Sequence, residues 1–303
     1  MKKIILILAF ITAVYGVQAQ QMGSFSQVVE NHYLVNPAAA GTDKTMPLFL
    51  GYRRMWTGID AAPSTQFITY SMPFTSEMGM GIKIFNYSTG PISKTGLSAT
   101  YSYSLDLGND MKLSFGLSGS LYQFYLDKSK VTLENSNDNT IMYSSEKLIV
   151  PDANFGVYFH GKNYFAGIAS FQLFNRNVNL MNDNLNNAQV RHYYFHGGYN
   201  AEIGSDIQVE PSVLVKFIEA GVSQWDLNVK TLYKEMLWLG LGYRSDFGFA
   251  PQDMIVSLGV QQGKIRFGYA YDICLSDLST YSAGTHEIIF IYSLGKGSGA
   301  LKF

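Results

Sequence analysis

Hydrophobic and polar residues alternate with a period of two over most of the chain. In one such run, serine, threonine and aspartate separate the apolar positions Leu97, Ala99, Tyr101, Tyr103, Leu105 and Leu107. This alternation predicts β-strands that have one apolar face and one small or polar face. A soluble β-sandwich shows the same alternation with its apolar face turned inward, so the periodicity alone leaves a sandwich and a membrane barrel open.

The lengths of the alternating runs favour the barrel. Many runs extend for ten or more residues, which is the length that a tilted transmembrane strand needs and is longer than most strands of soluble proteins. We predict about fourteen strands, at 48–56, 64–73, 78–87, 94–107, 111–126, 152–160, 163–173, 191–203, 207–217, 224–233, 236–246, 253–262, 264–274 and 285–294.

The connections between these strands fall into two alternating classes. After the even-numbered strands the turns are tight, and after the odd-numbered strands the connections are longer, notably 127–151, 174–190 and 275–284. Outer-membrane barrels have short periplasmic turns and long external loops. The chain is therefore predicted to be all-β, a closed antiparallel transmembrane β-barrel of the outer-membrane type, with both termini in the periplasm.

The first residues predict export. Lys2 and Lys3 form a basic start, an apolar run follows, and Val17-Gln18-Ala19 has the small residues of a cleavage site. This is the pattern of a secretory signal peptide, and its apolar core is too short for a membrane-spanning helix. We predict a signal peptide at 1–19, an N-terminal periplasmic or plug segment at 20–46, an outer-membrane barrel at 47–294 and a tail at 295–303.

Composition agrees with a chain that meets lipid and argues against a nucleic-acid partner. Charged residues make up 15% of the chain and aromatic residues another 15%, against about 25% charged residues in typical soluble domains. The formal net charge is −1, and removal of Lys2 and Lys3 makes it 20 − 23 = −3. The single cysteine, Cys274, cannot form an intrachain disulfide, so we expect it to pack as a small hydrophobic residue.

No pattern in the sequence indicates catalysis, a metal or a cofactor. His192 and His196 are four residues apart, but in a strand this spacing separates them by roughly 13 Å, too far for a shared metal ligand. No serine lies in a nucleophile motif, and the carboxylates are scattered. We therefore predict a protein that is not an enzyme, with both histidines at a barrel interface or in the lumen.

Two further features concern barrel construction. Pro211 lies within a predicted strand, where it removes a hydrogen-bond donor, so we expect a bulge or locally broken pairing there. Aromatic residues near the strand ends or on the apolar faces are predicted to form the girdles at the membrane interfaces. These residues are Trp56, Tyr122, Tyr125, Tyr164, Trp225, Trp238 and Tyr292.

Three segments carry a more specific resemblance. They are Phe25-Ser26-Gln27 with Asn36-Pro37-Ala38-Ala39-Ala40-Gly41, the stretch 52–66 with its Tyr-Arg-x-x-Trp-x-Gly-Ile-x-x-Ala-Pro core, and Gly268–Ile273 with Gly284–Ile288. Together they resemble the PorP/SprF family of type IX secretion system membrane proteins. The Asp-Pro that commonly precedes the Phe-Ser-Gln element is replaced by Met22-Gly23-Ser24, and Ala39 replaces an aromatic residue.

The resemblance implies a non-enzymatic accessory barrel that contacts the secretion machinery and assists export or surface attachment of large adhesin-like cargo, with a link to gliding motility. The alternative is an outer-membrane transport barrel for a small hydrophobic solute, which would need a continuous apolar pocket. The family-motif positions are expected to be structural or docking residues: Phe25, Asn36, Pro37, Gly41, Arg53, Trp56, Gly58, Pro63, Tyr271, Asp272, His286 and Glu287.

Two expectations follow for the residues before and within the first strand. The segment 25–35 is expected to form a short helix, either as a plug in the lumen or as a periplasmic docking segment. Arg53 and Arg54 are neighbours in a strand, so one should point inward and the other outward near an edge. An outward arginine in the middle of the membrane would cost about 2–4 kcal/mol.

Overall fold

A computed structural model describes residues 25–131, 147–176, 178, 189–219 and 221–295. The predicted signal peptide, the first residues of the segment that follows it and nearly all of the predicted tail lie outside this range. The structure contains β1 (Pro47–Arg54), β2 (Ser64–Pro73), β3 (Met78–Thr89), β4 (Ile92–Gly108), β5 (Met111–Leu126), β6 (Lys147–His160), β7 (Tyr164–Phe171), β8 (His192–Tyr199), β9 (Ala201–Ile203), β10 (Ile207–Ile218), β11 (Gln224–Tyr233), β12 (Leu237–Asp246), β13 (Pro251–Gln262), β14 (Ile265–Cys274) and β15 (Thr285–Ser293).

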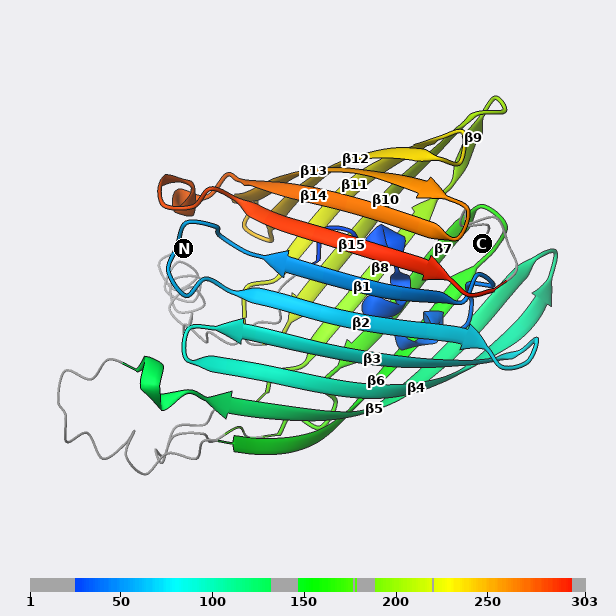
Figure 1. Cartoon of the computed structure of the whole chain (residues 1–303). Helices are drawn as coiled ribbons and strands as arrows, with labels where there is room; N and C mark the ends of the chain where they lie inside the picture. Colours follow the sequence, from blue (N-terminus) through cyan, green and yellow to red (C-terminus); the bar gives the residue numbers. More distant parts are fainter. Residues whose placement is uncertain (1–24, 132–146, 177, 179–188, 220, 296–303) are drawn as a thin grey trace, which may run out of the picture.

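These strands form one closed antiparallel barrel (Figure 1). Each strand pairs with its neighbours in sequence, and β1 pairs with β15 to close the sheet, with Arg53 opposite Glu287. Because β8 and β9 both pair with β10, they act as one interrupted strand, and the barrel has the fourteen strands that the sequence predicts. Closure leaves no open sheet edge, which is the condition for β-structure in lipid.

The interruption between β8 and β9 lies opposite Pro211. The pairing of β10 with β8 ends at Ser212, and its pairing with β9 resumes at Val209. On its other side β10 stays in register with β11 through Pro211. The locally broken pairing expected from the proline is therefore confirmed, because the residue without an N–H donor lies where the ladder is broken.

The two ends of the barrel differ in their connections. At the short-turn end the strands are joined by 74–77, 109–110, 161–163, 204–206, 234–236 and 263–264, and the connections 55–63, 127–146, 172–191 and 275–284 lie at the opposite, long-loop end. Two connections at the long-loop end contradict the expected pattern. Only Gly90 and Pro91 separate β3 from β4, because both strands extend further than predicted, and the connection 247–250 is no longer than the turn 74–77.

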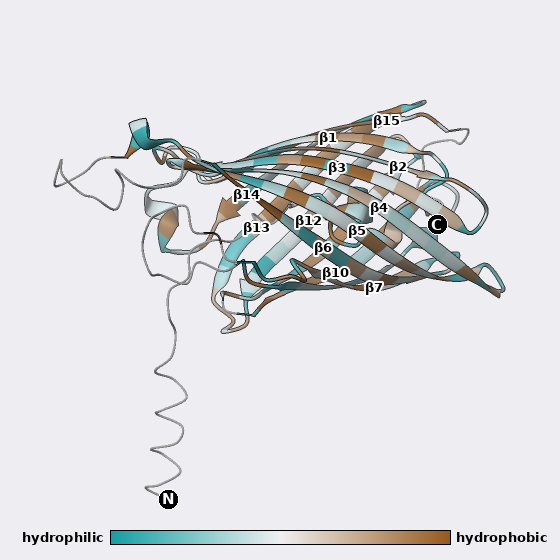
Figure 2. Cartoon of the chain, turned by 90° about the horizontal axis from the view of Figure 1, so that it is seen from below, coloured by the Kyte–Doolittle hydropathy of each residue, from teal (hydrophilic) through white to brown (hydrophobic). Residues whose placement is uncertain are grey.

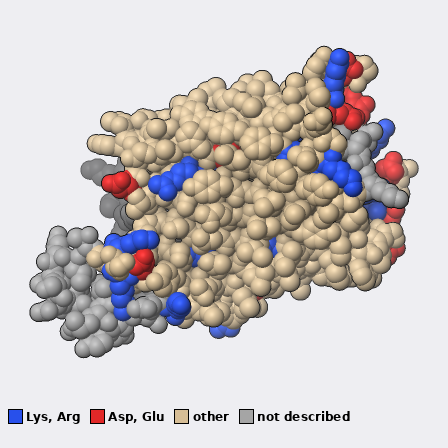
Figure 3. Space-filling view, in the orientation of Figure 1, with Lys and Arg blue, Asp and Glu red and all other residues tan. Residues whose placement is uncertain are grey.

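Alternate residues of the strands face outward and inward, as the sequence pattern requires. Large apolar residues point outward and are exposed, among them Ile82 and Ile84 of β3 and Leu239 and Leu241 of β12. Figure 2 shows apolar and polar residues interspersed along the strands, and Figure 3 shows a broad uncharged band with most charged side chains toward the ends. The exposed apolar surface is therefore the face that meets lipid.

The girdle prediction is wrong for two of its aromatic residues. Tyr122 is 2% exposed and Trp238 is 5% exposed, so both rings lie in the interior. The neighbours of Trp238, Leu237 and Leu239, point outward, and alternation therefore directs Trp238 inward. Its ring covers Gly259 on the adjacent strand, which fills the space that the glycine leaves.

The segment before β1 lies inside the barrel. It contains three short 3-10 helices, η1 (Val28–Glu30), η2 (His32–Leu34) and η3 (Pro37–Ala39), drawn in dark blue behind β1 and β15 in Figure 1. Two further 3-10 helices of the described residues, η4 (Lys128–Lys130) and η5 (Asp277–Thr280), have three and four residues. Within the described ranges no helix is long and apolar enough to cross a membrane.

The direction of this segment differs from the sequence-based expectation. Phe25 contacts Arg244 and Phe67, which lie near the long-loop end. At the short-turn end, the Met46 carbonyl accepts a hydrogen bond from the Leu294 N–H. The chain therefore runs through the lumen from one end to the other before it turns into β1. We expected both termini to lie at the same end of the barrel. The structure instead places Gly295 at the short-turn end and Phe25, the first described residue, near the long-loop end.

The outward face generates a stability prediction. Leu117 is 57% exposed near the middle of β5, and Leu107 is 50% exposed near the short-turn end of β4. Leu117→Arg should lower the free energy of unfolding in lipid vesicles by about 2–4 kcal/mol, and Leu107→Arg by about 0–1 kcal/mol. Urea titration of the vesicle-inserted protein measures both values. Equal costs at the two positions would show that the membrane is not centred on this part of the strands.

Candidate functional site in the barrel lumen

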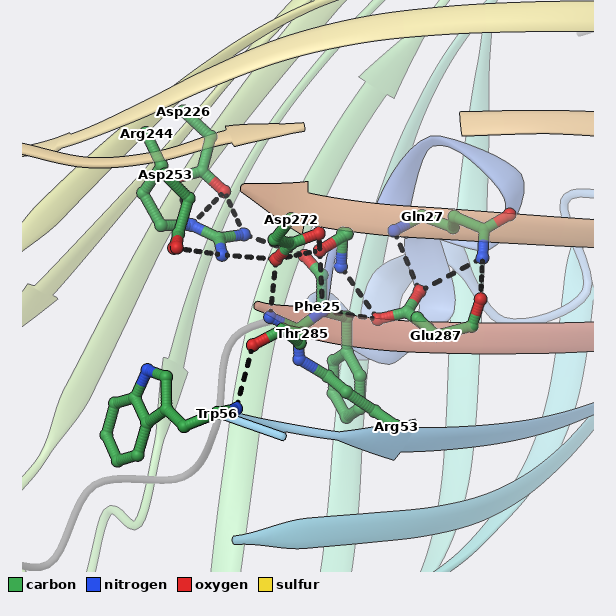
Figure 4. Close-up of polar contacts among 11 residues, drawn as sticks. Phe25, Gln27, Arg53, Trp56, Asp226, Arg244, Asp253, Asp272, Thr285 and Glu287 are labelled. Carbon is green, nitrogen blue, oxygen red and sulfur yellow. Dashed lines mark hydrogen bonds and ion pairs between the residues drawn. The ribbon is translucent and has the colours of Figure 1, made fainter. Parts of the chain in front are cut away.

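Arg53 lies at the centre of a buried ionic cluster near the long-loop end (Figure 4). Its guanidinium donates to Asp272 at 2.7 Å, to Glu287 at 3.0 Å and to the hydroxyl of Ser26 at 2.6 Å. The Ser26 hydroxyl in turn donates to Asp272 at 2.7 Å. Buried charges are tolerated when they are paired and hydrogen-bonded, so residue 26 completes a cluster that the barrel wall begins.

Glu287 also binds the main chain of the same segment. Its two carboxylate oxygens accept hydrogen bonds from the backbone N–H groups of Ser26 and Gln27, each at 2.9 Å. Hydrogen bonds to a charged acceptor are stronger than those between neutral groups. The wall therefore holds the backbone here as well as the side chains, in an arrangement visible in Figure 4.

Arg244 extends the cluster to the neighbouring strands. It forms a two-pronged contact with Asp226, through Nε at 3.0 Å and Nη2 at 2.9 Å, and its Nη1 donates to Asp272 and Asp253, both at 3.2 Å. Nη2 also donates to the carbonyl of Phe25 at 3.3 Å. Two arginines are thus paired with four carboxylates, on β11, β13, β14 and β15, and they also hold the start of the segment.

A second ionic cluster surrounds Glu30 further along the segment. Its carboxylate lies 2.9 Å from the Lys230 ammonium and 3.5 Å from the Arg266 guanidinium, and Lys230 also lies 3.5 Å from Glu210. Burial of this carboxylate is compensated by the two basic side chains beside it, since buried charges are tolerated when they are paired.

The opposite side of the segment is apolar. Phe25 packs edge-on against Phe67 with ring centroids 4.7 Å apart. Val28, Leu34 and Val35 belong to a buried cluster that includes aromatic side chains of β1, β2, β3, β5, β7 and β8. The segment is thus amphipathic near its start, where Ser26, Gln27 and Glu30 face the charged wall while Phe25, Val28, Leu34 and Val35 face the aromatic wall.

The Asn-Pro-Ala motif fixes the end of the segment near the short turns. The Asn36 side chain accepts from the Ala38 N–H at 2.9 Å, and it donates to the Val157 carbonyl at 3.0 Å and lies 3.1 Å from His196. Pro37 is the first residue of η3, where a missing N–H costs nothing. Gly41 follows η3 and lies against the backbone of β2 and β3.

The wall has glycines where this segment passes closest. A Cβ added at Gly116 of β5 would collide with the backbone of Ala38, and one added at Gly156 of β6 would collide with the Asn36 side chain. Gly119, an outward-facing residue of β5, has no such neighbour. The two inward glycines therefore make room for η3 and its cap.

We call residues 25–41 the lumen segment. Of the family-motif positions, the structure brings Phe25, Arg53, Asp272 and Glu287 together at one end of this segment and Asn36, Pro37 and Gly41 at the other. Arg53 is 1% exposed and points inward, and Arg54 is the last residue of β1. The expected division between the two arginines is confirmed.

The other motif residues lie in the long-loop end and on the outer face. The 55–63 connection is fixed by bonds from Met55 N–H to the Pro63 carbonyl at 2.8 Å and from Trp56 N–H to the Thr285 hydroxyl at 3.2 Å. Gly58 has a φ of 100°, which favours glycine. On the outer face, Tyr271 and His286 pack with ring centroids 5.0 Å apart. These residues support the rim and take no part in the buried clusters.

Sequence reasoning missed most of the charged network. It singled out none of Arg244, Asp226, Lys230, Arg266 and Glu30. The signal was present, because Arg244 and Lys230 occupy inward positions of strands whose outward neighbours are apolar. His192 and His196 are both buried, as expected for the lumen, and they make separate contacts, with Gln172 and with Asn36 respectively.

Cavities in the lumen are small. One of about 40 Å³ is lined by residues including His32, Tyr158 and His160, and another of about 20 Å³ by residues including Glu210 and Arg266. A single water occupies roughly 10–15 Å³ on this scale, so the smaller cavity has room for one or two waters and the larger for about three. In the part of the chain that the structure describes, no group of three His, Cys, Asp or Glu residues is arranged to hold a metal.

The fold and this site define a class of protein, a membrane β-barrel of the outer-membrane type with a lumen filled by its own N-terminal segment. A family model described as "Type IX secretion system membrane protein PorP/SprF" matches residues 17–292. The chain belongs to this family. It is therefore a membrane component of the type IX secretion system, associated with that machinery. Neither the family nor the fold indicates an enzyme. A comparison with curated proteins finds no match.

Solved structures with a similar fold include two outer-membrane barrels. The CymD monoaromatic hydrocarbon channel has a TM-score of 0.50 and 10% identity, covering 91% of this chain and 95% of that one. The toluene transporter TbuX of Ralstonia pickettii has a TM-score of 0.52 and 9% identity, covering 86% and 92%. At these identities the likeness shows the barrel fold alone.

The Arg53 cluster generates a second stability prediction. Arg53→Ala leaves Asp272 and Glu287 without their main partner and should lower the free energy of unfolding by about 3–5 kcal/mol. Arg54→Ala, at the half-exposed neighbouring position, should change it by no more than about 0.5 kcal/mol. Urea unfolding followed by tryptophan fluorescence gives both values. A small effect of Arg53→Ala would mean that water reaches these carboxylates.

Proposed function

We propose that this protein is exported by its N-terminal signal peptide to the outer membrane, where it assists the export or surface attachment of a specific large, adhesin-like cargo protein. It performs this work through its surfaces, as an accessory barrel of the type IX secretion system, and the lumen segment keeps its interior closed. The observation that carries the proposal is the filled lumen. The segment that fills it is held by hydrogen bonds of Ser26 with Arg53 and Glu287 and by the ion pair of Glu30 with Lys230.

The same observation disfavours transport of a hydrophobic solute. Such transport needs a continuous apolar pocket of several hundred Å³. The cavities of about 20 and 40 Å³ that the lumen segment leaves are lined in part by charged side chains such as Glu210, Lys230 and Asp43. The names of the hydrocarbon channel and toluene transporter therefore do not extend to this chain.

The direction of the lumen segment adds a surface to the proposal. If the long loops face the cell exterior, the segment begins at the external end of the barrel, where Arg244 and Glu287 hold residues 25–27. The external side then presents the start of the mature chain beside the long loops, and the periplasmic side presents the short turns. Cargo and machinery would contact the protein from these opposite sides.

Accessibility of inserted epitope tags tests this orientation. A tag placed directly before Phe25 and a tag after Lys130, which is 63% exposed, should both bind antibody on intact cells. Tags at 109–110 or after Gly295 should bind only after the outer membrane is permeabilised. Intact-cell labelling of the 109–110 tag would mean that the barrel is inverted. A tag before Phe25 that is hidden while the Lys130 tag is accessible would contradict the direction of the lumen segment.

Secretion tests the accessory function. Deletion of the gene should retain one large cargo protein inside cells while general outer-membrane permeability stays normal, measured by comparing secreted and cellular protein fractions. Removal of residues 25–35 alone should give a heat-modifiable barrel with the same secretion defect, because these residues hold both ionic clusters. A deletion strain that secretes all cargo normally but fails to take up a hydrophobic nutrient would favour the transport alternative.

A further inference from the structure

The imidazole of His196, on β8, lies against the end of the lumen segment near the short turns. It is 6% exposed, and its Nε2 atom lies 3.1 Å from the side-chain nitrogen of Asn36. The other contacts of the Asn36 amide fix the direction of this hydrogen bond. The amide oxygen accepts from the Ala38 N–H at 2.9 Å, and the amide nitrogen donates to the Val157 carbonyl at 3.0 Å. The amide nitrogen is therefore the donor toward His196, and Nε2 is the unprotonated acceptor.

A protonated His196 would have no acceptor for either of its N–H groups. At Nε2, the added proton would point at the NH2 group of Asn36, so two donors would face each other. At Nδ1, the described residues provide no hydrogen-bond partner. The pair also lies tightly against β7, where a Cβ added at Gly167 would collide with the facing nitrogen atoms of both side chains. Because a buried charge without partners is costly, the packed arrangement requires a neutral ring.

The ionisable rings around His196 supply no counter-charge. The ring of His32, in the lumen segment, lies 5.5 Å away, and Tyr158 of β6 stacks on His196 at the same centroid distance. His160, the last residue of β6, stacks on Tyr158 at 5.3 Å. Tyr194, the next inward residue of β8, packs against β7. A second protonated histidine in this group would add repulsion between like charges.

The carboxylates near these rings have other partners. Three of them are described: Glu30, Asp43 and Glu210. Lys230 pairs with Glu30 and Glu210 and also lies within electrostatic range of His32. Asp43 accepts a hydrogen bond of 2.8 Å from the Thr45 N–H. Glu30 and Asp43 line the cavity beside His32, and Glu210 acts on Tyr158. The described carboxylates thus lie on the side of these two rings.

The two ends of the lumen segment should respond differently to acid. At the long-loop end, Glu287 holds Ser26 and Gln27, and a glutamate takes up a proton only around pH 4. At the other end the hold depends on a neutral imidazole, and an exposed histidine takes up a proton around pH 6.5. The packed state is therefore favoured above about pH 6.5, and a state in which His196 is exposed gains stability as the pH falls below this value.

We propose that Asn36 and His196 form a proton-operated latch on the lumen segment. At neutral pH the latch holds residues 36–41 against the wall. Below about pH 6.5, His196 takes a proton from water at Nε2, the hydrogen bond from Asn36 breaks, and residues 36–41 leave the wall while residues 25–27 stay held. The ligand is the proton, and its uptake opens the lumen from the short-turn end. The latch is a property of the barrel itself and goes beyond the proposed function in secretion.

Hydrogen exchange of the wild-type protein in lipid at two pH values tests the latch. The reporters are the amides that donate within and after η3: Ala38, Ala39, Ala40 and Thr42. After correction for the intrinsic pH dependence of exchange, their protection should fall about tenfold from about pH 7.5 to about pH 5.5. Protection of Ser26 and Gln27 should change by less than about twofold. Unchanged protection of the reporters, or an equal fall at both ends, would overturn the proposal.

Two glutamine variants identify the responsible histidine. His196→Gln keeps an oxygen that can accept from Asn36 and removes the titrating group, so the reporters should keep their neutral-pH protection in acid. His192→Gln changes the other buried histidine of β8, which contacts Gln172, and should lose protection in acid as the wild type does. A folded His196→Gln barrel that still loses protection would assign the response to another group and overturn the latch.

A measurement on the wild-type protein covers the case in which His196→Gln does not give a heat-modifiable barrel. NMR of labelled histidines in detergent micelles should show the His196 ring neutral at pH 7.5, with its proton on Nδ1. The ring should then titrate with the same midpoint as the loss of protection of the reporters. A His196 ring that stays neutral through this loss, or that is already charged before it, would contradict the latch. None of these results depends on whether the protein acts in secretion.

Discussion

The structure depends on the pairing of charges inside a space that lipid and the barrel wall separate from bulk water. Arg53 is 1% exposed and Asp272 is fully buried, and an unpaired charge in such a position costs many kcal/mol. The wall places arginines opposite carboxylates on neighbouring strands, as Arg53 lies opposite Glu287 across the β1–β15 closure. Ser26 and Gln27 then occupy the remaining acceptors. Barrel closure and filling of the lumen are thus joined at one cluster.

The two-sided lumen explains why the filling element has its particular sequence. Phe25, Leu34 and their apolar neighbours pack against the aromatic wall, and Ser26 and Glu30 meet the charged wall. A segment that was apolar throughout would leave wall charges without partners, and a polar one would leave the aromatic cluster unpacked. Gly116 and Gly156 bring the wall close enough for η3 to fit. The motif that precedes the first strand is therefore part of the interior packing of the protein.

Much of the fold could be predicted from the sequence, because strand periodicity and the alternation of short and long connections are local patterns. The fourteen strands, the broken pairing at Pro211 and the division of Arg53 and Arg54 between the two faces followed from such patterns. The direction of the lumen segment could not, because it depends on contacts between residue 26 and residues more than two hundred positions away. The alternation of inward and outward residues also predicts that Tyr122 and Trp238 point inward. This was missed because aromatic rings of this kind are typical of membrane interfaces. The partners of Arg244 and Glu30 needed the register between strands, which no single strand reveals.

The central feature of this structure is that residues 25–41 are packed inside the folded barrel and hydrogen-bonded to its wall. Hydrogen exchange of the backbone amides, measured on the protein in detergent or lipid, tests this claim most directly. The N–H groups of Ser26 and Gln27 donate to Glu287, so they should exchange slowly, with protection similar to that of amides in β1 and β15. Exchange of these two amides at the rate of an unstructured peptide, while the strands remain protected, would contradict the account.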